Sequence, residues 1–147
     1  MLSVDRVDLD HDLLVIVGEG VVGFLEFTSL WYDLGEAPVL PELNGQLYDL
    51  RGCLVLLDPR EIEWILEEER VQGHLLRGKH VAIVSDMVVT YGTARRLQLR
   101  GGRARNYEVE VFGSIEEAHT WLGVARGTTS GVLPQCGERR AERAKLA

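Results

Sequence analysis

The sequence predicts a single α/β domain built on a mixed β-sheet. Short apolar runs that are typical of buried strands alternate with stretches whose apolar residues recur at helical spacing. In residues 79–96 one such run passes directly into a helical pattern, which indicates a strand with a helix docked against it. The chain has 147 residues, of which 46% are hydrophobic and 27% are charged, so it can bury a core of its own.

The first part of the chain predicts an antiparallel hairpin and then a helix. Val4, Val7 and Leu9 precede the turn-like residues 10–12, and the apolar run 13–17 follows them. From Val22 the spacing becomes helical, with one apolar face made of Phe24, Phe27, Trp31 and Leu34. Gly35 ends this helix, and the two prolines that follow it indicate a loop.

The middle of the chain predicts a strand at residues 46–50 and a helix that starts at Asp58-Pro59. Residues 53–57 fit either a continuation of the strand or a buried crossing segment. The Asp58 carboxylate can cap the helix, and proline suits its first position. We expect the helix to end at Gly73, to bury Ile62, Ile65 and Leu66, and to expose Glu61, Glu63, Glu67, Glu68 and Glu69.

The second half repeats the strand-helix pattern twice. Residues 79–85 predict a strand, and the helix after it is expected to begin at Ser85-Asp86 and to run to Leu99. Alternation over residues 107–112 predicts an edge strand, and Ser114 with Glu117 forms a capping box for a last helix. The predicted order is β-β-α-β-α-β-α-β-α, with an opening antiparallel hairpin and mainly parallel strands elsewhere. We expect one domain over residues 1–123 and a flexible basic tail over residues 124–147.

Composition restricts the classes of function. The formal net charge of −7 argues against a duplex nucleic-acid partner, whose phosphates an acidic surface repels. No apolar run approaches the length of a transmembrane helix, and the acidic N-terminus does not resemble a secretory signal. The two cysteines, Cys53 and Cys136, lie far apart, which fits a reducing compartment. We therefore expect a cytoplasmic protein of bacterial character, with Cys53 as a buried structural residue.

Several stretches resemble the SpoIIAA-like branch of the STAS-type domains, the fold of bacterial anti-sigma factor antagonists. The resemblance covers residues 3–123 and rests on Tyr48-Asp49-Leu50-Arg51-Gly52, on Val81-Ala82-Ile83-Val84 followed by Tyr91-Gly92-Thr93-Ala94-Arg95, and on residues 110–122. It implies a SpoIIAA-like fold that binds proteins or small ligands. Phosphorylated antagonists carry a serine where a helix begins after the central strand. The corresponding helix here begins Asp58-Pro59-Arg60-Glu61, so the resemblance does not carry over a phosphorylation switch.

The candidate site lies at the carboxyl edge of the predicted sheet, where open α/β folds form their crevices. Its residues are Asp49, Arg51, Tyr91, Gly92, Arg95 and Arg96. Asp49 and Arg51 lie two apart on a strand end and therefore point the same way. They could meet a ligand, although we favour a salt bridge or a cap that holds the following segment. Tyr91 and Arg95 could bind an anionic group from one helix face, or Tyr91 packs and the arginines are solvated.

A wider basic cluster is expected around the same helix, and it is the best candidate surface for an acidic partner or an anionic ligand. It comprises Arg95, Arg96, Arg100, Arg103 and Arg105. No arrangement of residues supports acid-base, nucleophilic or metal chemistry, because the histidines and cysteines lack ligand spacing. We therefore expect a non-catalytic recognition domain without a cofactor, which binds a protein partner or a small anionic or apolar ligand.

Two alternatives of other classes remain. Gly18, Gly20 and Gly23 form a G-x-G-x-x-G pattern between a strand and a helix, which could place a nucleotide phosphate at the helix N-terminus. An all-parallel sheet would favour this nucleotide- or dinucleotide-binding function, and an antiparallel first strand pair would favour the recognition domain. The other alternative is a homodimer through Trp64, which shares a helix with five glutamates and is expected to be exposed, whereas Trp31 and Trp121 are expected in the core.

Overall fold

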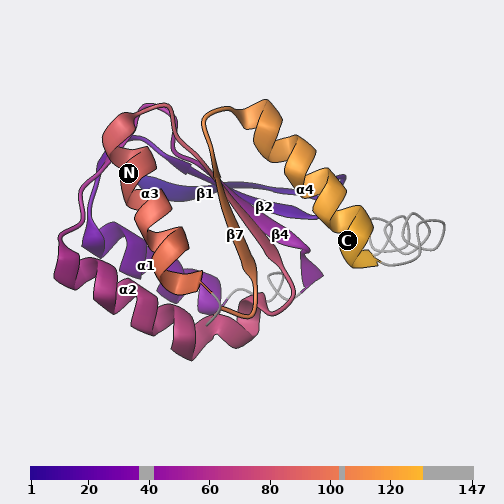
Figure 1. Cartoon of the computed structure of the whole chain (residues 1–147), viewed down its shortest axis with the longest axis horizontal. Helices are drawn as coiled ribbons and strands as arrows, with labels where there is room; N and C mark the ends of the chain where they lie inside the picture. Colours follow the sequence, from indigo (N-terminus) through magenta and orange to yellow (C-terminus); the bar gives the residue numbers. More distant parts are fainter. Residues whose placement is uncertain (37–41, 103–104, 131–147) are drawn as a thin grey trace.

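A five-stranded mixed sheet with the strand order β1-β2-β4-β6-β7 forms the centre of the molecule (Figure 1). β1 (Leu2–Asp8) pairs antiparallel with β2 (Leu13–Gly18). β4 (Gly45–Asp49), β6 (His80–Val84) and β7 (Glu108–Phe112) then continue the sheet from β2 in parallel. The predicted mixed sheet with its opening hairpin is confirmed, and β7 lies at an edge as expected.

The computed structural model describes residues 1–36, 42–102 and 105–130. Within these residues a second, two-stranded parallel sheet is formed by β3 (Gly20–Val22) and β5 (Cys53–Val55). The sequence left residues 53–57 open, and the structure assigns them a short strand that does not extend β4. β3 was not predicted, because its three residues lie inside the glycine-rich pattern that we assigned to a turn.

In the described part of the chain, four α-helices cover the sheet on its two faces. α1 (Phe24–Gly35), α2 (Pro59–Gln72) and α3 (Val88–Gly101) lie on one side, and α4 (Ile115–Ser130) lies on the other (Figure 1). A short 3₁₀ helix, Gly73–Leu76, follows α2. We expected the last helix to end at Gly123, whereas α4 continues to Ser130, and the rest of the predicted tail lies outside the described residues.

The helix starts follow local hydrogen bonds. Asp58 caps α2 in a complete capping box with Glu61, as predicted. The expected start of α3 at Ser85-Asp86 is wrong, because Met87 is the N-cap residue. Ser85 Oγ accepts from the Met87 backbone N–H at 3.2 Å, and the Asp86 carboxylate instead accepts from the Gly52 N–H at 2.9 Å. Asp86 therefore ties the loops after β4 and β6 together.

Alternation along the strands divides the core into two clusters. On β2, Leu14 and Ile16 face α1 to α3, while Leu13 and Val15 face α4. The α4 side is completed by the buried Ala118 and Leu122 together with side chains of β4 and β6. The other side is larger, because three helices and the small sheet pack against it.

Candidate functional site

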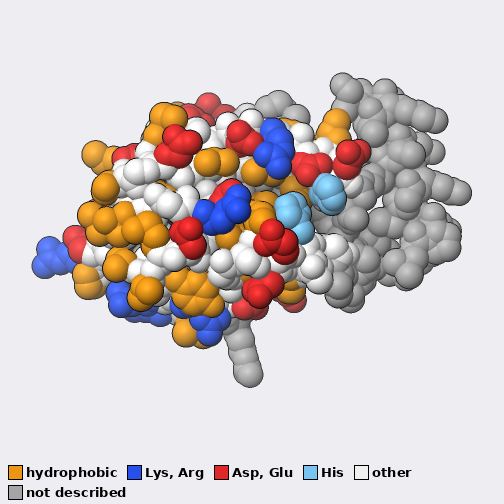
Figure 2. Space-filling view, turned by 90° about the horizontal axis from the view of Figure 1, so that it is seen from above, with side chains coloured by type: hydrophobic (Ala, Val, Ile, Leu, Met, Phe, Trp, Pro, Cys, Tyr) orange, Lys and Arg blue, Asp and Glu red, His pale blue; other side chains and the backbone are white. Residues whose placement is uncertain are grey.

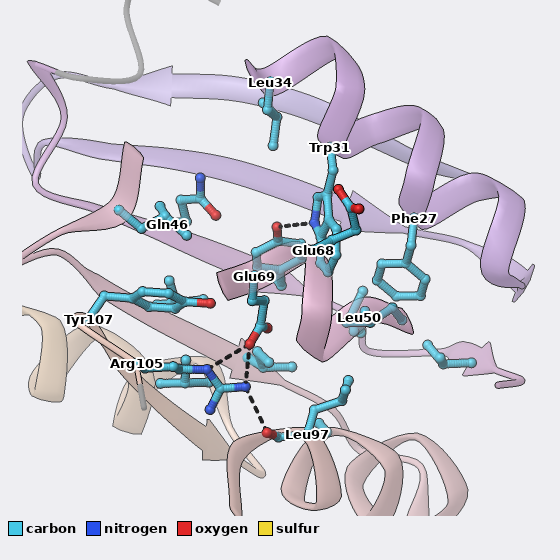
Figure 3. Close-up of a pocket in the computed structure, with 18 of the residues that line it drawn as sticks. Phe27, Trp31, Leu34, Gln46, Leu50, Glu68, Glu69, Leu97, Arg105 and Tyr107 are labelled. Carbon is cyan, nitrogen blue, oxygen red and sulfur yellow. Dashed lines mark hydrogen bonds and ion pairs between the residues drawn. The ribbon is translucent and has the colours of Figure 1, made fainter. Parts of the chain in front are cut away.

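A cavity of about 110 Å³ lies on the three-helix side of the sheet. Its wall is mainly apolar and includes side chains of α1, α2, α3 and the strands β4, β6 and β7 (Figure 3). A water molecule needs only about 10 to 15 Å³ of such volume, so this space is large enough for a small organic molecule. Apolar pockets with a few polar groups are the usual form of small-molecule sites.

The strand period determines which sheet residues line this cavity. Gln46 and Tyr48 of β4 lie two apart, as do Val81 and Ile83 of β6, so each pair shares one face. From α1 the cavity receives Phe27, Trp31 and Leu34, which lie four and three residues apart on the inner helix face. The apolar face predicted for this helix therefore lines a cavity that is large enough for a small molecule, instead of packing into a filled core.

A buried ion pair crosses one end of the cavity. Arg105 Nε donates to Glu69 Oε2 at 2.8 Å, and Nη2 lies 2.8 Å from the same oxygen (Figure 3). The Arg105 side chain is 6% exposed and that of Glu69 is 15% exposed. Burial raises the pKa of Glu69, and the attraction of Arg105 opposes this effect. The pair brings together α2 and the segment just before β7.

Arg105 also closes the carboxyl end of α3. Its Nη1 donates to the Gln98 carbonyl at 2.9 Å, and its Nη2 donates to the Leu97 carbonyl at 2.7 Å. The Gln98 carbonyl also accepts from the Gly102 backbone N–H, so the guanidinium adds a second donor and a positive charge at the carboxyl end of the helix, where cations are favourable. The guanidinium carbon also lies 5.7 Å from the centre of the Tyr107 ring. Arg105 is thus held by α2, α3 and Tyr107, the residue directly before β7.

Two tyrosines and an amide add neutral polar groups to the cavity wall. Burial raises the pKa of Tyr48 to about 12, and its hydroxyl oxygen accepts from Trp31 Nε1 at 3.3 Å. Burial likewise raises the pKa of Tyr107. Gln46 is 3% exposed, and its amide makes no side-chain hydrogen bond within the described part of the chain. All three side chains are therefore uncharged at neutral pH.

Asp49 and Arg51, two of the predicted site residues, contact each other. Arg51 Nε and Nη2 each lie 2.8 Å from an Asp49 carboxylate oxygen, which is a bidentate pair. The hydrogen bond from Arg51 is the main cause of a lowered pKa of Asp49. Of the two structural roles that we favoured, a salt bridge or a cap, the structure shows the salt bridge. The next residue, Gly52, has a φ of +70°, which favours glycine.

The other predicted site residues belong to α3 and make separate contacts. Arg95 donates to Gln98 Oε1 at 2.6 Å and lies 3.8 Å from Glu110 of β7. Tyr91, Gly92 and Arg96 are exposed. β4, which carries Asp49, is separated from β7 by β6, so the ion pairs of Asp49 and Arg95 lie on different strands. A ligand or partner at these six residues stays a prediction.

The prediction of a basic surface cluster is wrong for one of its arginines, which is buried, and other arginines of the cluster form ion pairs with glutamates. Arg105 is buried against Glu69, and Arg100 forms an ion pair with Glu63. Figure 2 shows one face of the molecule, on which Lys and Arg side chains near the centre lie beside Asp and Glu side chains. Arg103 lies outside the described residues. A continuous anion-binding patch is therefore a weaker candidate site than the cavity.

The cavity was not predicted from the sequence, because Glu69 and Arg105, the ion pair at one end of the cavity, were both expected to be exposed to solvent. Glu69 was expected on the exposed face of α2, yet it lies four residues after the buried Ile65 and seven after the buried Ile62. That spacing was a usable signal for an inward position. Arg105 lies before both the predicted strand 107–112 and the observed β7, so no strand alternation indicated its inward position.

The glycine pattern does not form a strand-to-helix phosphate turn. Gly18 ends β2, Gly20 begins β3, and only Gly23 directly precedes α1. A Cβ atom on Gly18 would lie 2.8 Å from Leu50 Cδ2 and 2.9 Å from Cys53 Sγ, so side chains already cover this glycine. The antiparallel first strand pair also favours the recognition domain over a nucleotide-binding fold.

Other chemistry finds little support in the described ranges 1–36, 42–102 and 105–130. They contain no group of three His, Cys, Asp or Glu side chains arranged for a metal ion, and no helix there has the length and apolar character to cross a membrane. Cys53 is fully buried, and burial raises the pKa of its thiol, which disfavours a nucleophile. Trp64 is 42% exposed, as expected, and packs edge-on against Phe24 at 4.9 Å between ring centres.

The structure is similar to a crystal structure from Shewanella loihica PV-4, an uncharacterised protein of the DUF3478 family with a SpoIIAA-like fold. The two agree with a TM-score of 0.51 over 83% of this chain and 92% of the other, at 17% sequence identity. The fold is SpoIIAA-like. The fold expected from the sequence resemblance is thereby confirmed. No family model matches the sequence, and no curated protein matches it either. A SpoIIAA-like fold does not by itself define a function, so the site must supply the argument.

Proposed function

We propose that this SpoIIAA-like domain is a non-catalytic binding protein whose ligand is a small, largely apolar molecule held in the cavity between the sheet and α1, α2 and α3. The observation that carries the proposal is the cavity of about 110 Å³ on one face of the sheet. The opposite face of the sheet, which packs against α4, is filled by apolar side chains. Interiors are normally close-packed, so a space of this size needs an explanation.

The composition of the wall supports an apolar ligand. Phe27, Trp31 and Leu34 line it from α1, and Val81 and Ile83 line it from β6. Ile83 is only half-buried although β6 lies inside the sheet, because its side chain borders the cavity. An apolar molecule in this space would remove such surface from water, at about 25 cal/mol per Å².

The absence of catalysis is part of the proposal and rests on how the polar groups are engaged. Glu69 and Arg105 neutralise each other, and the raised pKa of Tyr48 keeps its hydroxyl protonated at neutral pH. A general base needs a free, correctly poised acceptor within reach of a substrate proton. Binding of a protein partner at the carboxyl edge of the sheet is a second prediction. No contact among the described residues supports it.

The test is a thermal-shift titration with toluene, a probe that has no polar group. A ligand that binds only the folded state raises Tm in proportion to ln(1 + [L]/Kd), so we expect a saturable rise. In the variant Ile83→Phe the larger side chain occupies the cavity, and the rise should disappear. Retained signals in near-UV circular dichroism would show that this variant is folded.

A matched control is Val88→Phe, which adds the same ring at a position that is 89% exposed and outside the cavity wall. This variant should respond to toluene as the unmodified protein does. If toluene left Tm unchanged, or if Ile83→Phe responded normally, the cavity would not be a ligand site and the proposed function would be wrong.

A further inference from the structure

The polar end of the cavity contains charged and neutral groups that differ in how far they are already satisfied. The charged groups of the wall are Glu68, Glu69 and Arg105, of which Glu69 and Arg105 pair at 2.8 Å (Figure 3). The neutral groups are the Gln46 amide and the Tyr48 hydroxyl, which lie two residues apart on the same face of β4. Their spacing along a strand is about 6 to 7 Å, which one small polar group can bridge.

The ion pair leaves little charge for a ligand. An arginine has five N–H donors. In Arg105 three of them make hydrogen bonds, to Glu69, Gln98 and Leu97, and the Glu69 carboxylate neutralises the cation. An anionic ligand would have to displace Glu69 or lie beside it, and a cationic ligand would lie beside Arg105. The third charged side chain of the wall, Glu68, is also engaged in an interaction of its own. Either ion would therefore lose its hydration without gaining a free counter-ion, which is strongly unfavourable in a buried site.

The neutral groups, in contrast, retain hydrogen-bonding capacity. The Tyr48 oxygen accepts from Trp31 Nε1, and its own O–H meets no acceptor among the residues that the structure describes. The Gln46 amide offers two donors and an acceptor, and it makes no side-chain hydrogen bond within the same residues although the residue is only 3% exposed. Buried polar groups are nearly always hydrogen-bonded, so the spare donors and acceptor of these two cavity-lining side chains offer hydrogen bonds to a polar group of a ligand.

We infer that the ligand of this cavity is an apolar molecule that carries a neutral hydrogen-bonding group, such as a hydroxyl or a primary amide, and that the Glu69–Arg105 pair excludes carboxylates and ammonium ions. The inference rests on the proposed function and specifies its ligand class. Gln46 and Tyr48 contact the neutral group. Glu69 determines the preference for neutral over anionic ligands, because its carboxylate neutralises the Arg105 cation.

The test compares four octyl compounds that differ only in the polar group: octan-1-ol, octanamide, octanoate and octylammonium. Binding to the full chain is measured by isothermal titration calorimetry at neutral pH, where the acid and the amine are ionised. We expect the alcohol and the amide to bind at least about tenfold more tightly than either ion, because only the ions require desolvation of a charge.

A charge variant tests the role of the ion pair. Glu69→Gln keeps a side chain of similar size but leaves the Arg105 cation without a carboxylate. We expect octanoate to gain at least about tenfold in affinity relative to octan-1-ol in this variant, since the free cation can then pair with it. A role of Glu69 in folding alone would lower the affinity for all four compounds and would not change their order.

Glu67→Gln is the matched control, because it removes the same charge from an exposed position on α2. Its order of affinities should equal that of the unmodified protein. If octanoate bound the unmodified protein as tightly as octan-1-ol, the inferred ligand class would be wrong, while the cavity would remain a ligand site. If none of the four compounds bound and toluene also failed, the proposed function would fail as well. The comparison in the unmodified protein decides the ligand class even if Glu69→Gln does not fold.

Discussion

Replacement of Arg105 by methionine should destabilise the protein strongly. The substitution removes the counter-ion of Glu69, whose side chain is 15% exposed, and it removes the donors to the Leu97 and Gln98 carbonyls. Breaking a buried ion pair on one side costs about 3 to 5 kcal/mol, because the remaining charge stays buried without a partner. Since small domains are stable by about 5 to 15 kcal/mol, Arg105→Met should fold but unfold at much lower urea concentration.

The assay is equilibrium unfolding in urea, followed by far-UV circular dichroism, on a complete double-mutant cycle. Glu69→Met/Arg105→Met removes both charges and should be more stable than Arg105→Met by about 2 kcal/mol or more. Glu67→Met with Arg105→Met is the control and should show no such recovery, because Glu67 pairs with Arg70 at the surface. A loss below about 1 kcal/mol for Arg105→Met is the value of an exposed pair, and it would refute the argument from burial.

Three further predictions concern other parts of the fold. Burial holds the pKa of Tyr48 in the folded state at about 12, above the usual 10.0, so the unfolded chain loses this proton first. The stabilisation is complete below pH 10 and is lost as the pH rises toward 12. The unfolding free energy should fall by about 1 kcal/mol between pH 9 and pH 11 because of this linkage, and urea unfolding of Tyr48→Phe should show a decline that is smaller by this amount. Asp58→Ala should cost about 1 kcal/mol in the same assay, whereas Glu61→Gln, which keeps a capping box, should cost less. Gly18→Ala should cost about 1 to 3 kcal/mol by overpacking, whereas Gly113→Ala, where nothing lies within 4 Å of the added atom, should not show this loss.

The sequence was sufficient for most of the fold because the strong signals are local. The Asp58-Pro59 start of α2 and the alternation of β7 each depend on a few adjacent residues, and both are confirmed. The opening hairpin followed from two β-rich runs around a short link. β3 escaped prediction because its pairing with β5 joins segments about thirty residues apart, a relation that local periodicity does not contain.

The site was harder to predict than the fold because charge was taken as a sign of exposure. Glu69 lies in a run of three glutamates, so its position on the inner face of α2 was outweighed by its residue type. Charged side chains are almost never fully buried unless they are paired, and the partner of Glu69 lies 36 residues away. The contact between Asp49 and Arg51, in contrast, was predictable because the two residues are neighbours on one strand end.

The three-way attachment of Arg105 has a consequence for how such sequences diverge. A substitution that removes the charge of Glu69 or of Arg105 alone leaves the other charge buried without its counter-ion, so the single variant is poorly stable. Substitutions at the two positions should therefore appear together in relatives of this chain, with both charges kept or both lost. The salt bridge between the neighbouring Asp49 and Arg51 lies nearer to solvent, so these two positions should vary more independently.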